Sequence, residues 1–231
     1  MEKTDAVFPA GLEQPGGSFR FSEDALILGE SAASLLGETA SLCDLGAGCG
    51  IVAFAALRRK PLCIAVGVEK EPLLAAAARR NAERLGLAQR YAAVCGDLGE
   101  KAALHEAREC LKRMTGHSVG LPLFDMVACN PPWRREGTGR TPPSAMRRSA
   151  LFGGEETFAG FFSAADQILK DRGLLAVLAG AERTADLLAA LPPRLHAEEM
   201  RFWCRGQSAR RVLLLARKNG RADLTVEALS M

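Results

Sequence analysis

Residues 41–50 read SLCDLGAGCG, an apolar segment that ends in three alternating glycines. Glycine tolerates positive φ angles and lets backbone N–H groups approach a ligand closely. A helical segment follows at 51–59, and a second apolar strand at 62–70 (LCIAVGVEK) places Glu69 25 residues after Asp44. A carboxylate at the end of this strand accepts hydrogen bonds from ribose hydroxyls in nucleotide-binding α/β folds. A glycine loop alone also occurs as a structural turn, but the whole unit of strand, loop, helix, strand and acid favours nucleotide binding.

The remainder of the chain alternates strands and helices around this unit. We expect apolar strands at 91–97, 123–130 and 173–180, a helix over 157–171 that Gly173 ends, and a closing pair of strands at 196–205 and 209–218. Near-continuous apolar strands that alternate with helices are typical of a parallel sheet covered on both faces. The sequence therefore predicts an α/β, Rossmann-like fold: a mostly parallel, doubly wound sheet closed by a C-terminal antiparallel strand pair.

Length and composition fit one domain. The chain has 231 residues, 48% of them hydrophobic, so a sizeable core can be buried. Residues 1–17 are polar and end in Pro-Gly-Gly, and we expect them to form a flexible tail before a single domain at 18–231. Residues 98–122 are longer than a usual connection and contain a helical segment, so we interpret them as an insertion.

Cysteine usage and hydropathy favour a cytoplasmic protein. Seven cysteines without a CxxC pair indicate reduced thiols rather than disulfides or a metal site. Five of them lie in or beside apolar runs, which predicts core positions: Cys43, Cys63, Cys95, Cys129 and Cys204. The start of the chain does not resemble a signal peptide, and no apolar run reaches the ~20 residues that a membrane span needs. We expect neither a metal nor a membrane partner; monomer and weak dimer both stay open.

Charge is distributed unevenly along the chain. Residues 1–130 hold 14 Lys and Arg against 16 Asp and Glu, whereas residues 131–231 hold 16 against 11. The basic residues form two groups: Arg134, Arg135, Arg140, Arg147 and Arg148, then Arg201, Arg205, Arg210, Arg211, Arg217, Lys218 and Arg221. Such groups form either a solvated surface or a face for a polyanion.

A rigid corner follows the fourth strand. Residues 128–135 read ACNPPWRR, in which two prolines fix the backbone and donate no hydrogen bonds. In isolation this tetrapeptide, NPPW, is a turn signal. Because it follows the fourth strand of a glycine-loop fold, some 80 residues after the loop, we interpret it as part of a functional site.

These motifs resemble those of class I S-adenosylmethionine-dependent methyltransferases. The GxGxG loop with an acid two residues before it resembles their first motif, and NPPW resembles the (N/D)PP(Y/F/W) motif of amino-group methyltransferases. The known targets of that motif are adenine N6, cytosine N4 and glutamine N5. The resemblance implies S-adenosyl-L-methionine as cofactor, with these binding residues: Asp44, Gly46, Ala47, Gly48, Glu69, Lys70, Asp97, Leu98 and Asn130.

The resemblance assigns catalysis to Asn130, Pro131, Pro132 and Trp133. The lone pair of an exocyclic amine is delocalised, so two acceptors must draw its hydrogens and turn the lone pair towards the methyl group. Asn130 Oδ1 and the Pro131 carbonyl oxygen would be these acceptors. Trp133 offers a ring for a planar base, a contact worth ~1–3 kcal/mol.

Nearly the whole chain resembles the bacterial tRNA adenine-N6 methyltransferases. Residues 22–28 (SEDALIL) resemble that family's TDA-L-L segment, its NPPY reads NPPW here, and QSARRVLLLARK resembles its arginine-rich closing strands. The implied substrate is RNA, most simply a tRNA, and the implied contact residues are Ser22, Asp24, Arg134, Arg135 and Arg140. Alternatives are protein glutamine N5, as in release-factor methyltransferases, a DNA or small-molecule amine, and a non-catalytic binding module. Release-factor enzymes usually carry an N-terminal helical domain, which we do not expect here.

Overall fold

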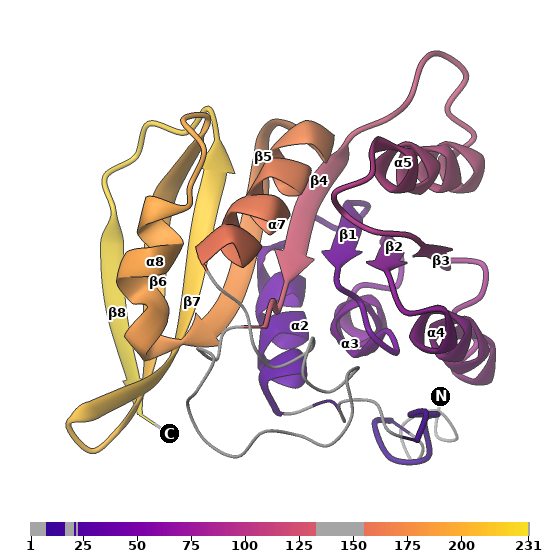
Figure 1. The fold of residues 1–231 in the computed structure, drawn as a ribbon. Helices are drawn as coiled ribbons and strands as arrows, with labels where there is room; N and C mark the ends of the chain where they lie inside the picture. The colour runs from indigo at the N-terminus through magenta and orange to yellow at the C-terminus, as the bar shows by residue number, and fades with distance from the viewer. Residues whose placement is uncertain (1–7, 17–20, 22, 133–154, 231) are drawn as a thin grey trace.

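The computed structural model describes the backbone of residues 8–16, 21, 23–132 and 155–230. Within them the chain forms an eight-stranded sheet in the order β3-β2-β1-β4-β5-β7-β6-β8 (Figure 1). The strands are β1 (Ser41–Leu45), β2 (Ile64–Glu69), β3 (Tyr91–Cys95), β4 (Phe124–Cys129), β5 (Leu169–Gly180), β6 (Leu195–Arg205), β7 (Ser208–Lys218) and β8 (Thr225–Ser230).

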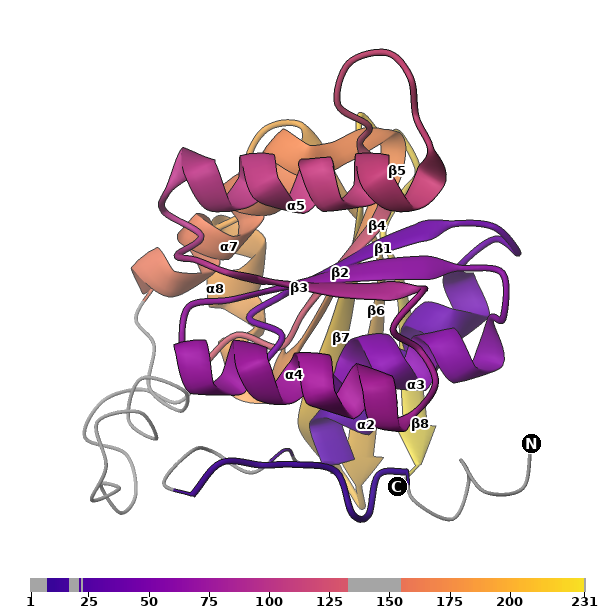
Figure 2. The same ribbon diagram turned by 90° about the vertical axis from the view of Figure 1, so that its right-hand side faces the viewer.

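Helices cover both faces of this sheet (Figure 2). One face packs against α2 (Glu23–Leu35), α3 (Ile51–Arg59) and α4 (Pro72–Arg84). The other packs against α5 (Lys101–Thr115), α7 (Glu155–Ile168) and α8 (Thr184–Ala189), the last preceded by the short 3₁₀ helix η1 (Ala181–Arg183). The predicted doubly wound α/β fold and its antiparallel β6–β7 pair are confirmed.

The central strands are apolar because neither of their faces meets water. β1 is buried at every residue, and β4 at all but one. β1 pairs in parallel with β2 on one side and with β4 on the other. The chain winds outward from β1 to β3 and then crosses back to β4, so the topological switch point lies between β1 and β4. Open α/β sheets bind ligands at the carboxyl ends of the strands at such a point.

Residues 98–122 contain α5, which connects β3 to β4 and packs on the sheet. This helix is therefore the crossover that a parallel β3–β4 connection requires. Its description as an insertion, and the division of the chain into a tail at 1–17 and a domain at 18–231, stay predictions.

The junction between α7 and β5 differs from the prediction. The expected helix reaches to Gly173, whereas α7 ends at Ile168 and β5 begins at the next residue. The β4–β5 register jumps from Leu169 to Leu174, and Arg172 within this bulge has a φ of 63°. Gly173 does not end a helix: a Cβ atom there would lie 3.2 Å from the Asp125 carbonyl oxygen, so glycine allows the two strands to approach.

The sequence did not indicate the eighth strand. β8 pairs in parallel with β6 and forms one edge of the sheet. Its six residues are exposed, except that Leu229 is half-buried. Because neither face of β8 is buried, its sequence (TVEALS) lacks the apolar alternation by which a strand is recognised.

All seven cysteines are free thiols. Cys43, Cys49, Cys63, Cys110 and Cys129 are buried, but the predicted core position is wrong for the exposed Cys95 and only partly met by Cys204. The described residues contain no group of three or more His, Cys, Asp or Glu placed to hold a metal. Among the described helices none has both the length and the apolar composition to cross a bilayer.

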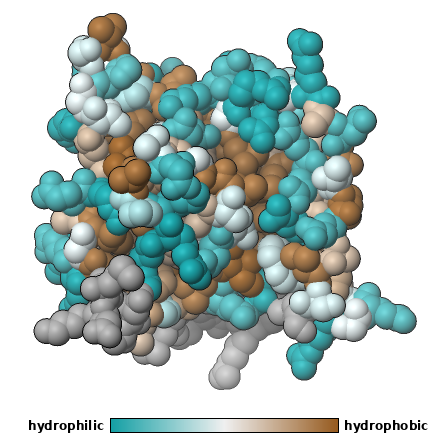
Figure 3. Space-filling view, turned by 180° about the vertical axis from the view of Figure 1, so that it is seen from behind, coloured by the Kyte–Doolittle hydropathy of each residue, from teal (hydrophilic) through white to brown (hydrophobic). Residues whose placement is uncertain are grey.

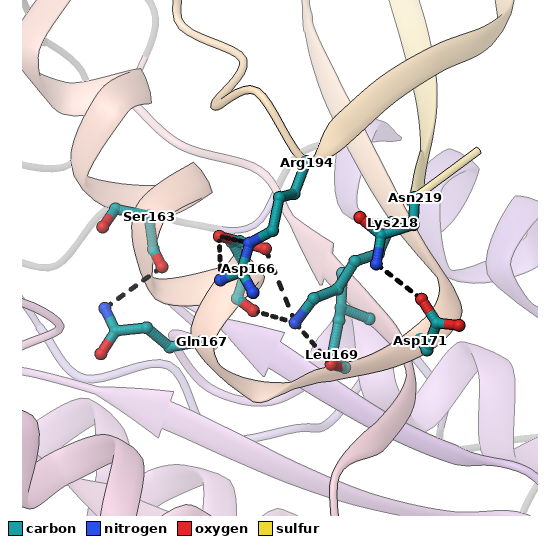
Figure 4. Close-up of polar contacts among 8 residues, drawn as sticks. All are labelled: Ser163, Asp166, Gln167, Leu169, Asp171, Arg194, Lys218 and Asn219. Atoms are coloured by element: carbon teal, nitrogen blue, oxygen red, sulfur yellow. Dashed lines mark hydrogen bonds and ion pairs between the residues drawn. The ribbon is translucent and has the colours of Figure 1, made fainter. Parts of the chain in front are cut away.

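A buried lysine fastens the end of α7 to β7 (Figure 4). Lys218 Nζ donates to the carbonyl oxygens of Asp166 and of Leu169, at 2.9 Å in the latter case, and lies 3.6 Å from Asp166 Oδ1. Arg194 donates to Asp166 Oδ2 through Nη2 at 2.7 Å. The last carbonyl groups of a helix lack intrahelical donors, so this ammonium acts as a cap.

We expect Lys218→Met to lower the free energy of unfolding by about 1.5–3 kcal/mol, the contribution of a hydrogen bond to a charged group. Lys170→Met is the matched control, because the half-exposed Lys170 forms a surface ion pair with Asp125. Such pairs contribute at most about 1 kcal/mol. Urea unfolding followed by circular dichroism compares the two variants, and equal losses would contradict the capping role of Lys218.

Candidate functional site

The glycine loop joins β1 to α3. Gly46, Gly48 and Gly50 have φ angles of 72°, 56° and 94°, which side chains disfavour. The Gly46 N–H donates to the Val68 carbonyl at 2.9 Å, which ties the loop to β2. A Cβ atom at Gly50 would clash with Phe54, whereas one at Gly48 would meet no atom within 4 Å. Gly50 is therefore needed for packing, and Gly48 lies on an open side of the loop.

Glu69 ends β2 beside this loop and is 7% exposed. Its Oε2 accepts a hydrogen bond from the Gly48 N–H at 2.8 Å, and its Oε1 accepts one from the Glu71 N–H at 2.9 Å. Burial raises the pKa of Glu69, and the two backbone hydrogen bonds oppose this shift. A carboxylate has about four acceptor positions, so Glu69 can anchor the loop and still accept from a ligand hydroxyl.

Asp44 lies near the end of β1 and is 1% exposed. Burial raises its pKa to about 7; a backbone hydrogen bond from Ala53 opposes the shift, and the nearby Glu69 adds to it. Asp44 Oδ2 has no hydrogen-bond partner among the described residues. Buried carboxylate oxygens are nearly always paired in native proteins, so this atom calls for a donor.

The rigid corner lies directly beside the glycine loop. Cys129, the last residue of β4, is the register partner of Leu45, the last residue of β1. Asn130 and Gly46 therefore leave neighbouring strands at the same edge of the sheet. Asn130 and Pro132 are half-buried and Pro131 is buried.

Lys70, Asp97 and Leu98 follow β2 and β3 at this edge. The Gly96 N–H donates to the Glu69 carbonyl at 3.0 Å, which holds the end of β3 against Glu69. Asp97 is exposed, and its Oδ1 accepts from the backbone two residues later at 2.8 Å. Lys70 is exposed and Leu98 half-buried. The structure thus gathers the predicted cofactor residues at one edge; their contact with a cofactor stays a prediction.

Part of the predicted substrate site lies outside the described residues: Ser22, Trp133, Arg134, Arg135 and Arg140. Asp24 is described and half-buried, and its Oδ1 accepts from Arg211 Nε. Arg211 is the register partner of Gly180, the last residue of β5. Asp24 therefore connects the start of α2 to β7 at the carboxyl edge, the edge of the sheet where the parallel strands have their carboxyl ends. The sequence did not indicate this structural role.

The C-terminal basic group does not form one free basic face. Four members are paired with acidic side chains or buried: Arg201, Arg211, Arg217 and Lys218. Arg205 and Arg210 are exposed at the tip of the β6–β7 hairpin, on the lower side of Figure 1 where the β4 and β5 arrows end. Figure 3 shows the molecule from behind the view of Figure 1, and hydrophobic and hydrophilic residues are interspersed on that face.

Two residues at the loop were not predicted. Phe161 of α7 packs on it, because a Cβ atom at Gly46 would lie 3.1 Å from its ring. Tyr91 of β3 lies beneath it: a Cβ atom at Gly67 would lie 2.3 Å from the Tyr91 hydroxyl oxygen and 2.8 Å from Ala47 Cβ. Phe161 has no signature that separates it from other core residues of a helix. Gly67 could have indicated the position of Tyr91, because a glycine inside a strand often marks a place where another group approaches the backbone closely.

Residues 31–110 match the family described as Precorrin methyltransferase domain. A Porphyromonas gingivalis protein named tRNA1(Val) (adenine(37)-N6)-methyltransferase is 28% identical over 180 residues, 76% of this chain and 64% of the relative. A Shewanella protein of the same name is 28% identical over 215 residues, 89% of this chain and 83% of the relative. A Release factor glutamine methyltransferase from Caulobacter vibrioides is 31% identical over 62% of this chain and 46% of its own.

Among solved structures, that of a protein described as a predicted O-methyltransferase from Agrobacterium tumefaciens has a TM-score of 0.66 and 24% identity. The match covers 90% of this chain and 86% of that one, which shows a common fold. The chain spans just under two thirds of the length of the Porphyromonas relative. These findings confirm the predicted resemblance to the Rossmann-like methyltransferases, the class that uses S-adenosyl-L-methionine.

We expect Glu69→Ala to weaken S-adenosyl-L-methionine binding by at least tenfold, because it removes a charge-assisted acceptor worth ~1.5–3 kcal/mol and frees the Gly48 amide. Glu69→Gln, which keeps one acceptor oxygen, should lose less. Glu83→Ala, which removes an exposed carboxylate from α4, is the matched control. Isothermal titration calorimetry measures all three, and an affinity unchanged by Glu69→Ala would remove Glu69 from the site.

Proposed function

We propose that this chain is an S-adenosyl-L-methionine-dependent N-methyltransferase that acts on adenine N6 in RNA, with a tRNA as its substrate. The observation that carries the proposal is the pairing of Leu45 with Cys129, because it brings the glycine loop and the Asn-Pro-Pro corner to one point. The tRNA methyltransferase relatives support the choice of substrate class, and the chemistry of the corner supports the choice of an amino group.

The described residues fit the proposed cofactor. S-adenosyl-L-methionine supplies an electrophilic methyl group on a sulfonium centre, and it carries ribose hydroxyls and an ammonium group as donors. Glu69 offers acceptor oxygens at the end of β2, and Asp44 offers a buried carboxylate under the loop. The open side of Gly48 leaves room for a ligand to approach the backbone. Two carboxylates facing a cationic ligand are electrostatically matched to it.

The corner has the acceptors that an exocyclic amine needs. Asn130 Oδ1 and the Pro131 carbonyl oxygen would each accept a hydrogen bond from the amine, which would turn the nitrogen lone pair towards the methyl group. The carbonyl direction is fixed because Pro131 and Pro132 have restricted φ angles. Bound S-adenosyl-L-methionine would supply the methyl group to this nitrogen and would leave as a neutral thioether, with the extra proton passing from the nitrogen to water. The amine starts neutral, so the protein supplies positioning rather than a base, an effect that reaches ~7–11 kcal/mol.

The carboxyl edge also offers positive charge to a nucleic acid. Arg205 and Arg210 are exposed at the β6–β7 hairpin tip, and neither forms an ion pair with another described residue. Arg134, Arg135 and Arg140 follow the corner in sequence. These side chains would hold phosphates, while the target adenine leaves its stack and meets Trp133, as single-stranded RNA bases do on aromatic rings. Such a protein would act in the cytoplasm.

Protein glutamine N5 is the second candidate, because the Caulobacter relative is named a glutamine methyltransferase. The same two acceptors suit an amide nitrogen, so the corner does not separate the two substrates. The separating experiment compares RNA and protein from cells with and without the gene by mass spectrometry. Loss of N6-methyladenosine from a tRNA supports the proposal, whereas loss of N5-methylglutamine supports the second candidate.

We expect Asn130→Ala to fold, to bind cofactor and to lose about 10²–10³-fold in turnover, as when one preorganised hydrogen bond to a transition state is removed. Asn130→Asp should retain more activity, because a carboxylate is also an acceptor. Asn219→Ala, an exposed asparagine after β7, is the control and should leave turnover intact. Single-turnover assays on the methyl-accepting RNA measure the step, and near-wild-type rates for Asn130→Ala would defeat the proposal.

We expect the double substitution Arg205→Ala and Arg210→Ala to weaken RNA binding and to lower the slope of log K against log[salt] by about 1.4, or roughly 0.7 per lost phosphate contact. Arg221, which lies between β7 and β8, is also exposed. Arg221→Ala is therefore the charge-matched control, and we expect it to leave the slope unchanged. Filter binding from low to high salt measures the slopes. An unchanged slope in the double variant would show that the hairpin tip only faces solvent.

A further inference from the structure

Two buried polar atoms beneath the glycine loop lack partners among the described residues: Asp44 Oδ2 and the Tyr91 hydroxyl oxygen. Asp44 is 1% and Tyr91 5% exposed. Buried polar groups in native proteins are nearly always hydrogen-bonded to protein or to an ordered water. Two such atoms in one place therefore point to a shared interaction.

The strand register brings these atoms together. Asp44 is the register partner of Gly67 across β1–β2, and Tyr91 is the partner of Ala65 across β2–β3. Residues two apart on a strand share a face, so all four point to the same side of the sheet. Gly67 has no side chain, and the Tyr91 hydroxyl fills that space, 2.3 Å from where a Cβ atom would lie. The hydroxyl thus reaches across β2 towards Asp44 on the adjoining strand.

The packing around the Tyr91 ring fixes the direction in which its hydroxyl points. Phe54 of α3 contacts Tyr91 edge to face, with ring centroids 4.8 Å apart. Ala47 of the glycine loop closes the space above Gly67, because its Cβ lies 2.8 Å from the position of an added Cβ. The phenol is therefore enclosed by α3, β2 and the loop, and its oxygen points to the loop's underside.

The groups around Asp44 leave few other donors. Five ionisable groups among the described residues interact electrostatically with Asp44: Glu69 on β2, Cys49 in the loop, Cys43 on β1, Cys129 on β4 and Tyr91. None of these is a cation. Burial raises the pKa of Cys49 to about 11 and that of Tyr91 well above its ordinary value, so both stay protonated near neutral pH. A tyrosine hydroxyl is a much stronger donor than a thiol.

We infer that Tyr91 is a positioning residue: its hydroxyl is joined to Asp44 Oδ2 by one buried water, to which it donates, and this bridge holds Asp44 ionised beneath the glycine loop. The ionised carboxylate keeps the loop and its open side at Gly48 ready for a cationic ligand. This role in ligand binding rests on the proposed S-adenosyl-L-methionine site, but the contact itself does not.

The contact predicts a direction for the pH dependence. A hydrogen bond to the charged form of Asp44 lowers its pKa, so in the wild type Asp44 should ionise below pH 7. Tyr91→Phe removes one oxygen, keeps the ring against Phe54, and should raise that pKa by roughly one unit. Cofactor binding, which favours ionised Asp44, should then weaken roughly three- to tenfold at pH 6 and recover by pH 8.5.

The first test needs no cofactor. Tyr91 is the only tyrosine in the chain, so protein labelled with ¹³C at tyrosine Cζ gives one NMR signal from this site. We expect that signal to shift with pH with a midpoint below 7, and to stop shifting in Asp44→Asn. A signal that is flat from pH 5 to 8 in the wild type, or that still titrates in Asp44→Asn, would overturn the contact.

The second test measures cofactor affinity against pH by calorimetry in wild type, Tyr91→Phe, Asp44→Asn and the double variant. We expect the Tyr91→Phe loss to be confined to low pH and to vanish in the Asp44→Asn background. A loss independent of pH would assign Tyr91 to packing alone. If Asp44→Asn does not fold, the pH profile of Tyr91→Phe decides by itself. Wild-type protein that titrates in the NMR test but binds no cofactor would contradict the proposed function and leave the contact standing.

Discussion

The parallel pairing of β1 with β4 is the constraint on which the site depends. Parallel neighbours end at the same edge, so the two loops that follow Leu45 and Cys129 must lie side by side. The pairing also fixes which side chains face which helices, because a slip of one residue would turn every side chain to the other face. Burial of both faces of β1 makes such a slip unfavourable. The glycine loop and the proline corner are therefore juxtaposed by core packing.

Glu69 shows how one side chain serves both architecture and binding. Its carboxylate bonds the Gly48 amide of one loop and the Glu71 amide of the next, so it couples the ends of β1 and β2. The same residue's carbonyl accepts from Gly96 and couples β3. A ligand held by Glu69 would thus contact a group already immobilised by three loops, which limits the entropy lost on binding.

Features with a local signature could be predicted from the sequence, and features made by distant partners could not. The glycine loop, the acid after β2 and the proline corner each have a fixed local pattern, so their positions at one edge followed from strand order. Arg211 and Asp24, by contrast, are 187 residues apart, and a count of charges cannot show that they form a pair. β8 was not predicted because nearly all of its residues are exposed, so that its sequence lacks apolar alternation. The start of β5 was not predicted because a bulge with Arg172 interrupts the strand. In the sequence Tyr91 does not differ from other aromatic residues of strands. Its special position becomes clear only from Gly67, where the Tyr91 hydroxyl occupies the space of a missing side chain.

The distribution of charge within the site divides it into two chemical halves. Asp44 and Glu69 stand under and beside the loop, where burial raises the pKa of both, so a cationic ligand relieves an existing repulsion between them. The corner carries only neutral acceptors among the described residues, an amide and a carbonyl. Such acceptors would orient the hydrogens of an exocyclic amine, which is already uncharged because its lone pair is delocalised. In the proposed site, the separation of anionic from neutral acceptors would let the loop attract a sulfonium while the corner orients an uncharged nucleophile.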